Sequence, residues 1–266
     1  MTSTRYGRVA VAEPPSSLAR AHWHDGSELQ TVSHPPKIPV LDQQDLRQQG
    51  IDTASLIPGA AEVDALGSCV ANATTAALSA ILPDARLTAL GIGAGPVADE
   101  EFAIRLYHNL TLLTGNPSSE FPPEDCGSSG LYACQYLEVH GIISGHKIAH
   151  GPVNILSLLQ QGPLIVGQPY LCAWEDPGSD HFIDGDGSLT TLEYDISGGV
   201  AGGHETCLYA IEEIGYDEQG ALDPFATVLR FRNSWGSGWA DSGSALVHLS
   251  TFAALGNYCD FRLLIA

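Results

Sequence analysis

Two hydrophobic periodicities divide the chain. Between residues 68 and 161, apolar side chains recur at intervals of three and four, the spacing of a helix with one buried face. The segments with this spacing are 68–82, 99–113, 129–140 and 153–161. Beyond residue 162, short apolar or alternating runs predict strands. These runs are 163–170, 204–217, 227–236 and 244–250. Because helices come first and strands second, the order predicts an α+β fold with an antiparallel sheet.

Local signals set the expected boundaries. Ser68 stands at the N-cap position of the first predicted helix. Residues 1–50 are polar and proline-bearing, which predicts an N-terminal extension that wraps the domain or is partly disordered. We expect residues 51–266 to form one domain, with a helical lobe at about 60–160 and a β lobe at about 161–260. A cleft between two such lobes is a natural place for an active site.

The charge of the chain excludes several classes of partner. The formal net charge is -20, with 31 acidic residues against 11 basic ones. Such a surface repels phosphate, so we expect neither nucleic acid nor an anionic membrane as a partner. The chain has no apolar run of about 18 residues and no signal-peptide pattern, and we expect a cytoplasmic protein.

The cysteines do not form a metal-binding pattern. Six are present, and no two are spaced as CxxC. In a cytoplasmic protein, reduced thiols are the default state. Zinc sites need ligands clustered at short spacing, so we expect no metal and no cofactor.

One cysteine is a candidate nucleophile. Cys69 follows Gly-Ser at the start of the first predicted helix, where free N–H groups and the helix dipole stabilise a thiolate. A buried, inert thiol is the alternative interpretation. A nucleophile also needs a base and a group that orients the base. His204 opens one predicted strand and Asn233 ends the next, so the two can face each other if these strands pair.

Three motifs carry a resemblance to a known family. "GSCVANA", "GGHETCLYAIEEIGYD" and "FRNSWGSGWADSGSALV" resemble, in this order, the motifs of the papain-like thiol hydrolases. The resemblance implies a two-lobed fold in which a helical lobe precedes an antiparallel β-barrel-like lobe, with the active site in the cleft. It also implies that Cys69 is the nucleophile, His204 the base and Asn233 the orienter. Trp235 would then shield the Asn–His contact from water.

The chain departs from the family before its cysteine. Val63 stands six residues before Cys69, where the family has a glutamine whose amide helps to bind the oxyanion. Leu66 stands where a cysteine is common, so the usual disulfide to the position of Cys126 is not expected. The first fifty residues also lack the helical pattern of an inhibitory pro-segment. Losing an oxyanion donor typically costs about 10²–10³ in rate.

These departures favour acyl transfer from a thioester over amide cleavage. The chain resembles one branch of the fold, the bacterial off-loading Dieckmann cyclases of tetramate and pyridone biosynthesis, which make antibiotics. Its composition is also typical of actinobacteria. The implied partner is a carrier protein of a polyketide or non-ribosomal peptide assembly line. Two alternatives stay open: an intracellular cysteine peptidase, and a non-catalytic binding protein on the same fold.

Other residues near the motifs have weaker signals. Ser68 and Gln168 are further candidates for shaping the site, and Gln168 could donate to a substrate or satisfy nearby backbone. Asp99 could serve as an acid partner of His204, although a solvated helix start is the simpler interpretation. Residues 179–187, "SDHFIDGDG", lack calcium-loop spacing and predict a turn. Cys207 alternates away from His204 and is expected in the core.

Overall fold

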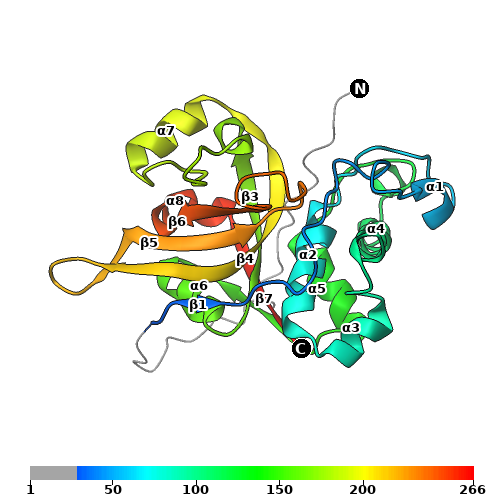
Figure 1. The fold of residues 1–266 in the computed structure, drawn as a ribbon, viewed down its shortest axis with the longest axis horizontal. Helices are drawn as coiled ribbons and strands as arrows, with labels where there is room; N and C mark the ends of the chain where they lie inside the picture. The colour runs from blue at the N-terminus through cyan, green and yellow to red at the C-terminus, as the bar shows by residue number, and fades with distance from the viewer. Residues whose placement is uncertain (1–28) are drawn as a thin grey trace.

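A computed structural model describes residues 29–266 of the chain. Helices α1 to α5 gather on one side of the molecule, and an antiparallel sheet forms the other side (Figure 1). The helical lobe consists of α1 (Thr53–Leu56), α2 (Cys69–Ile81), α3 (Asp84–Leu90), α4 (Pro96–Leu112) and α5 (Gly130–Val139). Small residues dominate α2, and 11 of its 13 residues are buried because neighbouring elements approach it closely on several sides.

The β lobe is built on one open sheet. Its strands are β1 (Val32–Ser33), β2 (Gly145–Ala149), β3 (Leu164–Leu171), β4 (Val200–Tyr216), β5 (Leu222–Arg232), β6 (Ser244–His248) and β7 (Asp260–Ile265). The strand order is β2-β7-β3-β4-β5-β6, and β1 pairs with β4. All pairs are antiparallel, as predicted. The sheet does not close on itself, so the expected barrel-like lobe is an open sheet.

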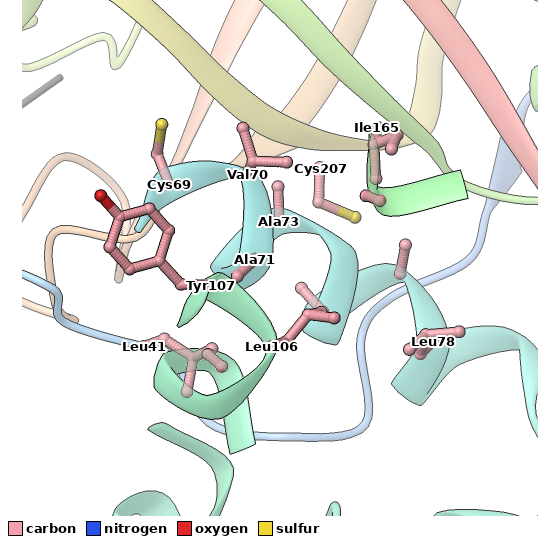
Figure 2. Packing of buried hydrophobic residues seen from close by; sticks show 14 of the residues in the cluster. Leu41, Cys69, Val70, Ala71, Ala73, Leu78, Leu106, Tyr107, Ile165 and Cys207 are labelled. Atoms are coloured by element: carbon pink, nitrogen blue, oxygen red, sulfur yellow. The ribbon is translucent and has the colours of Figure 1, made fainter. Parts of the chain in front are cut away.

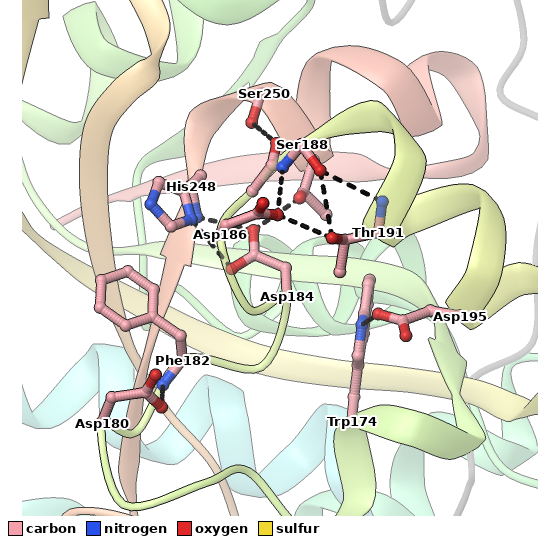
Figure 3. Close-up of polar contacts among 12 residues, drawn as sticks. Trp174, Asp180, Phe182, Asp184, Asp186, Ser188, Thr191, Asp195, His248 and Ser250 are labelled. Carbon is pink, nitrogen blue, oxygen red and sulfur yellow. Dashed lines mark hydrogen bonds and ion pairs between the residues drawn. The ribbon is translucent and has the colours of Figure 1, made fainter.

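Short helices and an ordered connection complete the β lobe. The helices are α6 (Pro152–Leu159), α7 (Leu189–Ser197) and α8 (Leu249–Leu255), with 3-10 turns at Cys172–Glu175 and Gly256–Tyr258; a further 3-10 turn at Pro117–Ser119 lies between α4 and α5. Polar contacts hold the connection from β3 to β4 (Figure 3). The buried Asp184 carboxylate accepts from the His248 backbone N–H at 2.8 Å and from Thr251 Oγ1 at 2.6 Å. Asp186 accepts from Ser188 N–H and Thr191 Oγ1 just before α7.

Both faces of the central strands are buried. Ile165 of β3 and Cys207 of β4 belong to the core of the helical lobe. Their neighbours Val166 and Leu208 point to the opposite face and belong to the core of the β lobe. This explains why β3 is apolar at successive positions instead of alternating. It also confirms that Cys207 is a core residue.

Seven elements escaped the sequence prediction: β1, α1, α3, β2, α7, α8 and β7. Each is nine residues or shorter, and so carries too few positions for a clear period. The helical lobe ends before the predicted boundary at about residue 160, because β2 pairs with β7 and α6 packs in the core of the β lobe.

The first described residues run along both lobes. β1 adds to the sheet beside β4, while Ile38, Leu41 and Leu46 are buried in the core of the helical lobe. The rest of the predicted N-terminal extension, residues 1–28, lies outside the described part of the chain. Within residues 29–266, no helix is long and apolar enough to cross a membrane.

Candidate active site

Cys69 is the first residue of α2 and is buried. Its sulfur points away from the packed apolar side chains below it (Figure 2). The preceding turn is held by Asp125, whose two carboxylate oxygens accept from the Gly67 N–H at 3.0 and 2.9 Å. Tyr107 donates to the same carboxylate at 2.6 Å. Ser68 occupies the N-cap position as predicted, but its hydroxyl makes no capping hydrogen bond.

His204 and Asn233 meet because β4 and β5 pair. His204 Nε2 lies 2.7 Å from Asn233 Oδ1. The same oxygen accepts from the Ser234 backbone N–H at 2.8 Å, which fixes the orientation of the Asn233 amide. Since Oδ1 is an acceptor, His204 Nε2 must carry a proton and donate. The neutral ring therefore keeps Nδ1 unprotonated, and Nδ1 is the atom able to act as a base.

Aromatic rings enclose this pair. The Trp235 ring stacks on the His204 ring with centroids 5.0 Å apart, and Tyr170 meets it edge-on at 5.0 Å. Burial lowers the pKa of His204 to about 4, although the hydrogen bond to Asn233 acts in the opposite direction. His204 is consequently neutral at pH 7, as a general base must be.

Val63 occupies the loop before α2 without offering a donor from its side chain. It is half-buried and packs against the core of the helical lobe, while its backbone N–H donates to Thr53 Oγ1 at 3.2 Å. The carboxylates on either side of it, Glu62 and Asp64, both lie 3.1 Å from Arg47 Nε. Arg47 thus partly neutralises the negative charge that these residues would bring to a nearby oxyanion.

Gln168 lies directly opposite His204 in the β3–β4 register. Side chains of directly opposed residues point to the same face of an antiparallel pair. Gln168 is fully buried, and neither Oε1 nor Nε2 has a hydrogen-bond partner among residues 29–266. It therefore does not satisfy nearby backbone, which was one of the two predicted roles.

Two other predicted features turn out differently or play no part in this site. Asp99 is fully buried, accepts a hydrogen bond from Gly93 N–H and has a pKa raised by burial, so the expectation of a solvated helix start is wrong. Residues 179–187 form turns between β3 and α7. Within the described chain, no group of three or more His, Cys, Asp or Glu side chains could hold a metal ion.

The segment before α1 contributes two glutamines that the sequence did not point to. Gln43 Nε2 donates to the Leu66 carbonyl at 3.0 Å, and its Oε1 accepts from Ser234 Oγ at 2.6 Å. This clamp joins the turn before Cys69 to the residue after Asn233. Gln44 comes next and lines a groove together with Trp235. No motif marks either glutamine, because they lie far from Cys69 in the sequence and only the fold brings them near it.

The groove beside Trp235 is strongly acidic. Its volume is about 380 Å³, and Trp239 forms part of its wall. Asp42, Asp45 and Glu175 also line it, and burial raises the pKa of Asp42. A positive or neutral group is therefore favoured in this groove over an anion.

Comparisons with known proteins agree with this architecture. Neither a protein-family model nor a curated protein sequence matches the chain. Among solved structures, xylellain, a cysteine protease from Xylella fastidiosa, is similar with a TM-score of 0.63 and 16% identity, over 99% of this chain and 97% of that one. Digestive procathepsin L 3 from Tenebrio molitor larval midgut is similar with a TM-score of 0.54 and 14% identity, over 99% and 77%. The chain therefore has the fold of the papain-like cysteine proteases.

Proposed function

We propose that the protein is an enzyme with a cysteine nucleophile, in which His204 takes the proton of Cys69 and Asn233 orients His204. The observation that carries this proposal is the fixed Asn233 amide. It assigns the proton to His204 Nε2 and leaves Nδ1 as the base. Burial keeps the ring neutral at pH 7, and Trp235 covers the pair.

For the reaction, we propose acyl transfer from a thioester followed by ring closure, the activity of a Dieckmann cyclase. Support comes from Val63, whose side chain cannot donate to an oxyanion. A thioester has a better leaving group than an amide, so it tolerates a weaker oxyanion site. In addition, no disulfide forms among residues 29–266, so none braces the turn before Cys69.

In the proposed reaction, Cys69 and His204 carry every bond change and proton transfer. The carrier protein presents an N-(β-ketoacyl)aminoacyl thioester. Cys69 attacks its carbonyl, a new thioester forms on Cys69, and the carrier thiol leaves with the proton that His204 held. His204 next removes a proton from the methylene between the two carbonyls. The carbanion attacks the Cys69 thioester, a C–C bond forms, the C–S bond breaks, and the thiolate recovers the proton. The product is a tetramate or pyridone ring.

Gln44 is our candidate for the donor that Val63 does not provide. The clamp made by Gln43 holds this segment between the turn before Cys69 and Ser234, and Gln44 lines the groove beside Trp235. We expect Gln44→Ala to lower kcat by about 10²–10³ with little change in KM, because an oxyanion donor acts in the transition state. Gln49→Ala is the matched control, since Gln49 Nε2 donates only to the Asp42 and Asp45 carbonyls. Equal activity of both variants would contradict the assignment.

The cyclase proposal has a direct test. Purified protein is incubated with an N-acetoacetyl-aminoacyl thioester, and the products are separated by mass spectrometry. We expect the cyclic product, which is one water lighter than the linear acid, and none from Cys69→Ala. Linear acid alone from the wild type would contradict the cyclase and leave a hydrolase.

A cysteine peptidase is the second candidate, and the acidic groove favours it. Asp42, Asp45 and Glu175 suit a leaving group with a positive charge better than the phosphate on the arm of a carrier protein. Xylellain, which shares the fold, is itself a cysteine protease. This candidate predicts turnover of peptide amides, with a preference for lysine or arginine after the scissile bond. It also predicts covalent trapping of Cys69 by peptide epoxides.

A further inference from the structure

A small void lies behind the His204–Asn233 pair. Its volume is about 10 Å³, and residues of α2, of β4, of the end of β5 and of the segment before α1 line it. Apolar side chains form part of its wall, but five polar residues also line it. These are Asn72, Glu205, Arg232, Asn233 and Ser234.

Hydrogen bonds fix the orientation of three of these polar side chains. Asn72 Nδ2 donates to Glu100 Oε1 at 2.6 Å, and the acceptor atom of the same amide, Oδ1, takes no part in this bond. Asn233 uses Oδ1 for His204 and Ser234, which leaves its Nδ2. Arg232 Nη1 donates to the Ile38 carbonyl at 2.9 Å, which leaves Nε.

None of the three remaining atoms has a partner in the described chain. Asn72 Oδ1, Asn233 Nδ2 and Arg232 Nε are all buried and make no hydrogen bond to any group of residues 29–266. The side chains of Asn72 and Asn233 are themselves almost fully buried, at 1% and 3% exposure. An orphaned buried polar group costs about 1–3 kcal/mol, so three around one void require an explanation.

The size and chemistry of the void match one water molecule. A buried water needs roughly 10–15 Å³ and two to four polar partners. Its two lone pairs can accept from Asn233 Nδ2–H and Arg232 Nε–H, and one of its hydrogens can be donated to Asn72 Oδ1. A metal cation is disfavoured by the Arg232 guanidinium, and an anion is disfavoured by the Glu205 carboxylate in the wall.

We propose that a buried water joins Asn72, Arg232 and Asn233 in this void, and that Asn72 is thereby a positioning residue for His204. This inference rests on the proposed roles of Cys69, His204 and Asn233. The water completes the hydrogen bonding of the Asn233 amide on the side away from His204. Asn72 lies three residues after Cys69 on α2, so the same water links the helix of the nucleophile to the strand end of the orienter.

A high-resolution crystal structure of the full chain tests the water itself. We expect electron density for one oxygen about 2.7–3.2 Å from each of Asn72 Oδ1, Asn233 Nδ2 and Arg232 Nε. A void without density, or density bonded to only one of these atoms, would overturn the proposal.

The positioning role is tested with Asn72→Leu, a variant of similar volume that can bond neither to the water nor to Glu100. Thr75→Val is the control, because Thr75 is equally buried on α2 and its hydroxyl donates only to the Ala71 carbonyl. Alkylation of Cys69 by iodoacetamide is followed from pH 4 to 10 by peptide mass spectrometry. This readout needs no knowledge of the substrate.

In Asn72→Leu we expect alkylation at neutral pH to be about fivefold slower, the equivalent of one ordinary hydrogen bond. The rise of the rate with pH should also move to higher pH, because a less firmly held His204 takes the Cys69 proton less readily. Thr75→Val should keep the wild-type profile. An unchanged profile in Asn72→Leu, or the same shift in both variants, would overturn the positioning role. A wild-type Cys69 that titrates as an ordinary thiol would instead contradict the proposed function.

Discussion

Asn233 determines which proton His204 carries. Its amide could be turned either way, but the Ser234 N–H donates to Oδ1 and excludes the flipped orientation. The ring of His204 must then donate through Nε2. A single backbone N–H on the neighbouring residue thus sets the tautomer of His204.

Replacing this amide with a carboxylate should move the titration of His204. Burial holds the pKa of His204 at about 4, below its ordinary value of 6.5. Asn233→Asp places a negative charge beside the ring, which favours the protonated form and raises this pKa by about 1–3 units. The acid limb of the activity profile should move up in pH with it. Histidine NMR titration measures the shift, and a pKa unchanged from the wild type would contradict the contact.

Gln168 should destabilise the fold that holds it. Its amide is fully buried opposite His204, with no partner among residues 29–266. We expect Gln168→Leu to raise the free energy of unfolding by about 1–3 kcal/mol, because an orphaned amide is replaced by an apolar side chain of similar size. Urea denaturation measures the change.

Gln43→Leu is the matched control for Gln168. Gln43 is equally buried, but its amide bonds to both Leu66 and Ser234. This variant should lose stability by a similar amount. A Gln168→Leu variant that is less stable than the wild type would contradict the prediction for Gln168.

At the residue level, the sequence predicted what short motifs encode. Cys69, His204 and Asn233 each sit in a recognisable block, and the contact between the last two was expected from strand pairing. The roles that we propose for Asn72 and Gln44 could not be predicted, because they depend on which neighbours surround these residues after folding. Asp99 was misjudged because helix α4 begins three residues earlier than expected, at Pro96, and buries it.

At the scale of elements, the loop after β5 requires a glycine at position 236. Gly236 has φ +73°, and a Cβ there would lie close to the Asp42 carboxylate. Gly236→Ala should therefore cost about 1–3 kcal/mol of stability and loosen Trp235 over His204. Gly238→Ala, two residues away with nothing within 4 Å of the added Cβ, should be nearly neutral. Thermal unfolding compares the two, and equal losses would contradict this account of the loop.

The length of an element decided whether the sequence revealed it. Helices α2 and α4, with 13 and 17 residues, repeat their apolar stripe often enough to be recognised. Strands β2 and β7 have five and six residues, and β2 pairs with β7 without a turn between them that would mark a hairpin. Their partnership spans more than a hundred residues, so only the assembled fold defines it.

Across the whole molecule, two buried groups make stability depend on pH in opposite directions. Burial raises the pKa of Glu100 from 4.5 to about 7, so the folded state holds an extra proton between these values, and stability falls as pH rises through them. His204 has its pKa lowered from 6.5 to about 4, so the folded state holds fewer protons there, and stability falls as pH drops through that range.

Replacing Glu100 with a residue that cannot ionise should remove its contribution to the pH dependence of stability and leave that of His204. The glutamine in Glu100→Gln cannot ionise. As the pH rises from 4.5 to 7.5, the free energy of unfolding of this variant should therefore increase relative to that of the wild type by up to about 3 kcal/mol. Glu101→Gln is the control, because the neighbouring Glu101 is partly exposed and pairs only with Arg105 in an i,i+4 contact. Urea denaturation across this pH range measures both. A constant difference between Glu100→Gln and the wild type would contradict the raised pKa.

The central claim is that this fold makes a nucleophile of Cys69, and the chain contains its own reference thiol. Cys172 is exposed, whereas Cys69 is buried at the first position of α2. Protein is mixed briefly with an acyl thioester and quenched in acid, and the acylated peptides are identified by mass spectrometry. We predict that the acyl group is found on Cys69 ahead of Cys172, and that His204→Ala abolishes only the Cys69 adduct. Acylation of Cys172 alone, or of Cys69 to the same extent without His204, would contradict the account.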